Sequence, residues 1–353
     1  MVKQAPKTDA NLKRNNEMEL FRCLFIIAIA VMHFSNSYFK SCPYYSGAYI
    51  GTEFFFLLSG FMIAKKAFCQ ADTLSPYQFT FQRMKKLYPD YLFAFLLLFI
   101  LSLVSGAIAC KDALKTLFGY IFELLFLHAS GLKCSGLLNY PTWYLSSLLI
   151  GGCIIYGLIC FHRKLYLTII APVSVIATYS FFSANVGHMD VWGSAQILHL
   201  SDGLTRGFAA MSLGCLSYCL SHHISQFKNH IEKNFGLKLL LTLSELFCLC
   251  FVLFESAFVA DSQMDFYLIL LLFIGITLSF SNITFTGQIF SQIPFLEFLG
   301  KLSYQMYVYQ LFIICWFCLY LPNLGYRTGI LCFLLCLIAF SLLVYQIKKW
   351  VVK

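Results

Sequence analysis

The stretch LFRCLFIIAIAVMHFSNSYF at residues 20–39 decides the fold. An apolar helix of about 20 residues is long enough to cross the roughly 30 Å hydrocarbon core of a bilayer. Up to residue 34 its ionisable interruptions are Arg22 and His33. Because a polar stretch precedes this run and Arg22 interrupts its start, we expect a retained helix rather than a cleavable signal peptide.

The composition extends this interpretation to the whole chain. Of its 353 residues 59% are hydrophobic and 12% are charged, whereas soluble proteins average about 25% charged residues. So few charges would not cover the surface of a soluble domain of this size, but helices that face lipid need no such cover. The sequence therefore predicts an all-α integral membrane protein.

Ten apolar segments are near the length of a membrane span. They lie at about 20–39, 48–68, 87–108, 142–161, 165–183, 204–220, 237–257, 265–281, 301–321 and 328–347. A further run at 113–128, with Glu123 and His128, is shorter and more amphipathic, and we expect a surface or re-entrant helix there. Without an internal repeat or linker, a single transmembrane domain over 20–347 is predicted.

The distribution of lysine and arginine predicts the orientation, because cytoplasmic loops are rich in both. Ten spans place the main basic clusters on one side, with the segment 1–19 and the tail 348–353 in the cytoplasm. The formal net charge of +9 therefore follows the membrane rule, and we expect no nucleic-acid partner. The outer loop at 109–141 is an exception, with three lysines of its own.

The fifteen cysteines mostly lie within apolar runs, where they are typical packing residues, and we expect no metal site. Three of them fall in predicted outer loops, where a disulfide is left open: Cys42, Cys110 and Cys134.

Arg22 and His33 are eleven positions apart, which places them within roughly 20° of one helix face and about 16 Å apart along the axis. We expect them to face one cavity, with Arg22 at the cytoplasmic edge and His33 near mid-membrane. An ionisable residue at that depth is a functional candidate. The alternative is that His33 only bonds a neighbouring helix and that Arg22 extends to the interface.

Two further segments carry charge next to apolar residues. Glu53, near the outer end of the second span, is an acid that could orient the imidazole of His33, or it could simply face water. A basic group at the start of the third span, Arg83, Lys85 and Lys86, suits the phosphates of a nucleotide-bearing cofactor. It equally suits anionic lipid headgroups.

Six segments together carry a family resemblance. RCLFIIAIAVMH (22–33), GTEFFFLLSGF (51–61) and RMKKLYPDYL (83–92) resemble the Arg-x10-His, acid-containing and Tyr-Pro segments of acyltransferase family 3. Later segments of that family resemble PTWYLSSLL (141–149), GLTRGFAAMSLGCL (203–216) and FLGKLSYQMYVYQLF (298–312), so the likeness covers about residues 17–350. Gln310 stands where many relatives have histidine, so a second histidine cannot act at that position.

The resemblance implies a multi-pass enzyme of the bacterial inner membrane that moves an acyl group from acyl-CoA, usually acetyl-CoA, to a hydroxyl of a surface or lipid-linked glycan. It implies His33 as general base, Glu53 as stabiliser of the imidazolium, Arg22 as a charge-fixing residue, and the basic group of the third span as the donor site. An acyl-histidine intermediate is the rival scheme. Substrate-binding candidates are Arg206, Trp143 and Tyr144. Arg206 could instead pair with Asp202, and Trp143 and Tyr144 could stack on a sugar or belong to the aromatic belt at the membrane interface.

Two functions of other classes remain open. Ten spans with buried charges also suit a glycan or small-molecule exporter without covalent chemistry, and an envelope assembly could use such a chain as a structural subunit. Membrane lipids are expected partners in every case, and no feature of the sequence argues for a homo-oligomer.

Overall fold

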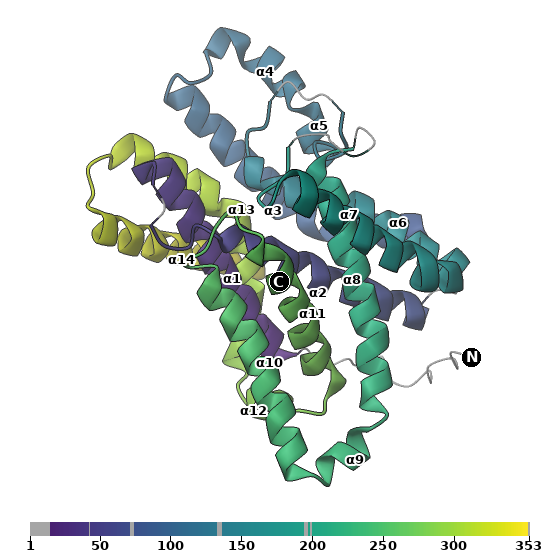
Figure 1. The fold of residues 1–353 in the computed structure, drawn as a ribbon. Helices are drawn as coiled ribbons and strands as arrows, with labels where there is room; N and C mark the ends of the chain where they lie inside the picture. Colours follow the sequence, from purple (N-terminus) through teal and green to yellow (C-terminus); the bar gives the residue numbers. More distant parts are fainter. Residues whose placement is uncertain are drawn as a thin grey trace.

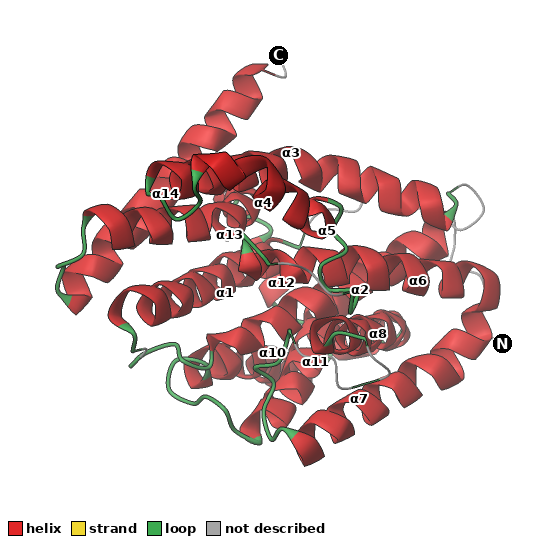
Figure 2. Ribbon diagram, turned by 90° about the horizontal axis from the view of Figure 1, so that it is seen from above, coloured by secondary structure: helices red, strands yellow, loops and turns green. Residues whose placement is uncertain are grey.

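The computed structural model describes residues 15–41, 43–70, 74–132, 136–193, 197 and 200–351. Within these ranges the chain consists of helices and loops and contains no strand, as Figure 2 shows. The helices are α1 (Asn16–Phe34), α2 (Gly51–Gln70), α3 (Pro76–Val104), α4 (Ala113–Gly119), α5 (Ile121–Leu124), α6 (Trp143–Leu165), α7 (Ala171–Asn185), α8 (Asp202–Ser225), α9 (Lys228–Glu232), α10 (Phe235–Glu255), α11 (Met264–Ser281), α12 (Thr286–Phe290), α13 (Phe295–Tyr320) and α14 (Tyr326–Val351). The all-α prediction is confirmed.

The helices divide into a central and a peripheral group. The apolar windows of α1 and α2 are 72% buried, whereas those of α3 and α14 are 28% and 22% buried. In Figure 1, α9 joins the lower ends of α8 and α10, and α11 lies between these two helices and packs on both. Side chains on α1 and α2 therefore face other helices rather than lipid.

Close packing of α2 on α8 depends on two glycines. A Cβ atom on Gly60 would collide with the backbone of Met211, and one on Gly214 would collide with the backbone of Leu57. Small residues let helix backbones approach in this way. The contact fixes the rotation of α2 and hence the direction in which Glu53 points.

Among the described residues, eight helical stretches are long and apolar enough to cross a membrane. One of them, Tyr140–Asn185, contains both α6 and α7, which are separated by non-helical backbone at His162 and a π-helical turn at Tyr166–Ile170. α8 is not among the eight, although it fills the place of the predicted span at 204–220. The count of ten spans and the side of each terminus stay predictions.

The third span begins earlier than predicted. Ser75 and Gln78 form a capping box, with Pro76 in the first turn, and this combination is a strong helix start. Pro89 lies inside the helix and does not end it. Arg83 therefore lies about two turns inside α3, not at its start as expected.

The helices also extend into both predicted terminal segments. α1 begins at Asn16, and α14 continues to Val351, so Lys348 and Lys349 of the predicted tail are helical. One of them, Lys348, pairs with the carboxylate of Asp90 on α3 at 2.7 Å. This contact ties α14 to α3.

The predicted surface helix is two short helices, α4 and α5, and α4 is largely exposed. Cys110 and the other cysteines within the described ranges are free thiols. Cys42 and Cys134, the remaining candidates for an outer disulfide, lie outside the described residues.

Candidate active site

His33 lies in the last turn of α1 and is half-buried. Its Nδ1 atom lies 3.2 Å from the hydroxyl of Tyr140, and the two rings meet edge to face with centroids 5.5 Å apart. Tyr140 opens the short 3-10 turn that leads into α6. The imidazole therefore has a defined orientation, set by a residue more than 100 positions away in the sequence.

The turn that carries Tyr140 is held in place by side chains of α5 and α13. Glu123, a buried side chain of α5, accepts hydrogen bonds from the backbone N–H groups of Leu138 and Asn139 at 2.7 and 2.8 Å. The Tyr307 hydroxyl on α13 donates to the carbonyl of Pro141 at 2.6 Å. Burial raises the pKa of Glu123, although these two N–H bonds act in the opposite direction. Tyr140 was missed in the sequence, where its one signal is its place directly before the segment PTWYLSSLL.

Arg22 and Arg83 converge on Tyr144. The two guanidinium charges act on each other and on the Tyr144 hydroxyl, which also lies 3.2 Å from the hydroxyl of Ser59. Arg22 donates to Glu19 at 3.2 and 3.4 Å, but its buried Nε atom has no partner within the described chain. The ion pairs found among the described residues do not include Arg83. Two guanidinium groups thus lie near each other with one ion-paired carboxylate, Glu19, found among the described residues.

Lys85 does not share the helix face of Arg83, although the sequence predicts a group of three with Lys86. Both lysines are exposed, whereas Arg83 is half-buried. Two residues along a helix correspond to about 200°, so Lys85 points away from the face that Arg83 uses. A different lysine, Lys66 on α2, feels the charge of Arg83 and lies 5.2 Å from the Phe79 ring.

Glu53 is fully buried at the start of α2, and its partners are not those expected. Its two carboxylate oxygens accept hydrogen bonds from Arg206 Nε at 2.5 Å and from the Tyr179 hydroxyl at 2.7 Å. Among the described residues no hydrogen bond or ion pair joins Glu53 to His33. The predicted direct stabilisation of the imidazolium by Glu53 is therefore wrong.

Arg206, on the first turns of α8, is 1% exposed and uses all three of its nitrogen positions. Besides Glu53, it donates from Nη1 to the carbonyl of Val191 at 3.2 Å and from Nη2 to that of Tyr49 at 3.0 Å. A substrate would have to displace one of these bonds, so the predicted substrate-binding role of Arg206 is not supported. The carboxylate that pairs with Arg206 is that of Glu53, not that of Asp202 as the alternative predicted. The sequence does contain a signal for this pair. Glu53 and Arg206 each stand near the start of a predicted span that follows an outer loop, so both lie near the same side of the membrane.

Trp143 is 9% exposed and packs beneath Arg206, whose guanidinium carbon lies 5.7 Å from the indole ring. A buried indole has no free face for a sugar, so the predicted stacking role of Trp143 is wrong. The hydroxyl of Tyr144, one position further, lies instead 3.2 Å from that of Ser59 and is within the influence of both arginine charges.

Tyr140 and Tyr144 connect the histidine to the arginines. They are four residues apart, Tyr140 in the 3-10 turn before α6 and Tyr144 in the first turn of α6, with Tyr140 beside His33 and the charges of Arg22 and Arg83 acting on Tyr144. The later residue of α1, His33, therefore meets the earlier tyrosine, Tyr140, and the earlier residue, Arg22, lies near the later tyrosine, Tyr144. The two halves of the Arg22–His33 pattern thus meet one partner helix.

A comparison with known families decides the class of this chain. The family model of an acyltransferase domain, acyltransferase family 3, matches residues 15–346. The chain belongs to this family. No curated protein and no solved structure matches it.

Membership of acyltransferase family 3 makes the chain a multi-pass membrane acyltransferase that uses an acyl donor and an acceptor. The site brings together an imidazole, a tyrosine hydroxyl that lies 3.2 Å from its Nδ1 atom, and two arginines. In the part of the chain that the structure describes, no three metal-ligating side chains come together.

Gln310 fills the position of the additional histidine of many acyltransferase family 3 relatives. It is fully buried in α13, and neither atom of its amide group has a hydrogen-bond partner within the described ranges. An amide does not titrate, so Gln310 cannot transfer a proton, and His33 is the only histidine of the matched motifs.

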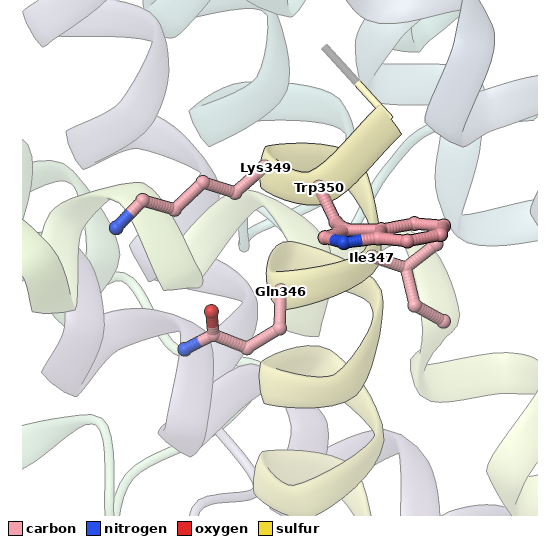
Figure 3. A pocket seen from close by; sticks show the side chains of 4 residues that line it. All are labelled: Gln346, Ile347, Lys349 and Trp350. Carbon is pink, nitrogen blue, oxygen red and sulfur yellow. The ribbon is translucent and has the colours of Figure 1, made fainter. Parts of the chain in front are cut away.

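An open depression at the end of α14 is not part of this acyltransferase site. Figure 3 shows its four lining residues, Gln346, Ile347, Lys349 and Trp350. All four belong to one stretch of a single helix, so the depression is a gap between neighbouring side chains. None of the predicted site residues lines it.

Proposed function

We propose that this acyltransferase moves an acyl group, most simply acetyl, from a cytoplasmic acyl-CoA to a hydroxyl of a surface or lipid-linked glycan in the bacterial inner membrane. The observation that carries the proposal is the half-buried His33, bonded through Nδ1 to a tyrosine hydroxyl. This leaves Nε2 as the ring nitrogen that can meet an acceptor. No metal is required for this chemistry.

The hydroxyl of Tyr140 has one proton to give. It lies within hydrogen-bonding reach of Ser37 as well as of His33. When Tyr140 donates to Ser37, it accepts from His33 Nδ1–H, and Nε2 then keeps a free lone pair. That tautomer is the form of histidine that acts as a general base.

In the proposed step, His33 Nε2 takes the proton of the acceptor hydroxyl while its oxygen attacks the thioester carbonyl. The carbon–sulfur bond then breaks, and the thiolate of coenzyme A leaves and takes the proton from His33 Nε2, which restores the neutral imidazole. Direct transfer requires only one residue that moves a proton. This fits a site in which His33 is the only histidine of the matched family motifs. The rival acyl-histidine scheme would use the same Nε2 as nucleophile.

Arg22 and Arg83 would hold the donor. Arginine forks bind phosphate oxygens well. Arg22 is paired with Glu19, whereas Arg83 has no ion-pair partner among the described residues, so the two guanidinium groups are only partly neutralised. Tyr144 lies between them and the Tyr140–His33 pair. Lys86, one turn from Arg83, extends the basic surface of α3, and Lys85 lies outside this arrangement.

The test is a His33→Ala variant in producing cells, with His223→Ala as control, since His223 is an exposed histidine of α8 that packs only on Phe227 among the aromatic rings. General-base catalysis contributes about 10²–10⁴ in rate, so we expect exported glycan that has lost its ester, measured by mass spectrometry. His223→Ala should keep the ester. Glycan that stays inside the cell with unchanged composition would favour an exporter and overturn the proposal.

A further inference from the structure

The loop at residues 189–192, between α7 and α8, is fixed by backbone hydrogen bonds to buried groups. The backbone N–H of Met189 donates to the Asp265 carboxylate at 2.8 Å, and the Val191 carbonyl accepts from Arg206 at 3.2 Å. The carbonyl of Trp192 accepts from the backbone N–H of Gly203 at 3.1 Å. Three attachments within four residues leave this loop little freedom.

Trp192 differs from Trp143, although both lie beside the start of α8. Trp192 is 37% exposed, and its ring lies 6.3 Å from the ring of Tyr140 at an angle of 32°. A Cβ atom on Gly203 would come within 2.9 Å of both the Trp143 ring and the Trp192 carbonyl. Glycine at this position therefore lets one indole be buried while the next is presented outward beside Tyr140.

A carboxylate completes this surface. Asp190 is exposed, and its charge acts on both Tyr140 and Arg206. An aromatic face beside a carboxylate suits a neutral sugar. The C–H groups on one face of the sugar ring can cover the indole, while the hydroxyls of the sugar donate hydrogen bonds to the carboxylate. The same carboxylate disfavours a phosphate or another anion at this place.

We propose that Trp192 and Tyr140, with Asp190, form the acceptor subsite, which binds a neutral sugar ring and brings its hydroxyl to His33. This inference rests on the proposed function. Glu53 and Arg206 are positioning residues in it, because they hold the loop that presents Trp192. The alternative for Trp192 is an aromatic side chain at the lipid interface, a frequent place for tryptophan.

The experiment uses membranes that contain the full-length protein and two probes, radiolabelled acetyl-CoA and the surface polysaccharide of the producing cells after mild base has removed its esters. For Trp192→Ala we expect the half-saturating concentration of polysaccharide to rise about tenfold, the value for about 1.4 kcal/mol of lost stacking. The half-saturating concentration of acetyl-CoA should not change. Trp192→Phe should stay within about threefold of the wild type, since it keeps a ring.

The matched control is Trp316→Ala. Trp316 on α13 is 39% exposed and packs only on Phe317 and Tyr320 among the aromatic rings, so it has the exposure of Trp192 without a link to His33. If Trp192→Ala and Trp316→Ala bind the polysaccharide equally well while the wild type is active, the subsite is refuted and the proposed function is not. If the wild type transfers no acetyl group to the polysaccharide, the proposed function itself is refuted, and the subsite with it.

Discussion

Arg206 and the pair Arg22 and Arg83 are the same type of residue in opposite surroundings. Arg206 is 1% exposed, and its guanidinium is satisfied by Glu53 and two backbone carbonyls. The Arg22 side chain is 33% exposed and keeps a buried Nε atom without a partner in the described structure. Arg83 is half-buried beside it.

The difference separates a structural charge from one that is available to a ligand. A buried ion must be paired, because removal from water costs several kcal/mol. Arg206 meets that condition within the protein. Two neighbouring arginines without a carboxylate between them repel each other, and an anionic donor would relieve this repulsion.

The largest effect is expected for Arg206→Met. The variant leaves the Glu53 carboxylate buried with only Tyr179 as partner, and loss of one member of a buried pair costs about 3–5 kcal/mol. We therefore expect a clear fall in the thermal unfolding midpoint of the detergent-solubilised protein.

The double variant Glu53→Gln with Arg206→Met should recover part of that loss, because the buried charge is gone while two carbonyls stay unpaired. It should keep a kcat near that of the wild type, since Glu53 does not touch His33, but the half-saturating concentration of polysaccharide should rise, because the Val191 carbonyl loses its bond to Arg206. An unfolding midpoint of Arg206→Met equal to that of the wild type would show that the pair is not structural.

Arg83→Met should instead leave the unfolding midpoint unchanged, because no described carboxylate loses its partner. A charged hydrogen bond is worth about 1.5–3 kcal/mol, so the half-saturating concentration of acetyl-CoA should rise by roughly 10- to 100-fold. Kinetics with radiolabelled acetyl-CoA would measure this. Lys85→Met is the control on the same helix and should change the value by less than about twofold, as exposed charges do. An equal rise in the half-saturating concentration of acetyl-CoA in both variants would mean that the overall positive charge at the start of α3, not the arginine pair, binds the donor.

Tyr140→Phe should have the smallest effect. It removes the hydroxyl that orients His33, and a neutral hydrogen bond is worth about 0.5–1.5 kcal/mol, so kcat should fall about three- to tenfold at an unchanged half-saturating concentration of acetyl-CoA. Tyr304→Phe is the control, because it loses a comparable bond, to the carbonyl of Leu87 at 2.8 Å, away from His33. An unchanged kcat for Tyr140→Phe would remove this tyrosine from the proposed mechanism.

Much of the fold could be predicted, because length and hydropathy identify apolar helices without knowledge of their partners. The error at the start of α3 arose because its first two turns are polar, and only the capping box of Ser75 marks their helical state. The site was less predictable. Spacing placed Arg22 and His33 on one face of one helix, but Tyr140 comes from another helix and its contact depends on how α5 and α13 hold the turn before α6.

The sequence by itself determined the membrane class, the helix positions and the resemblance to acyltransferase family 3, since each depends on local composition or on motifs in order. Only the tertiary structure decided that Glu53 belongs to Arg206 and that His33 belongs to Tyr140. Glu53 and Arg206 are 153 residues apart, and which residues meet across such a distance depends on the rotation and depth of each helix. Those are set by packing, such as that of Gly60 and Gly214 between α2 and α8.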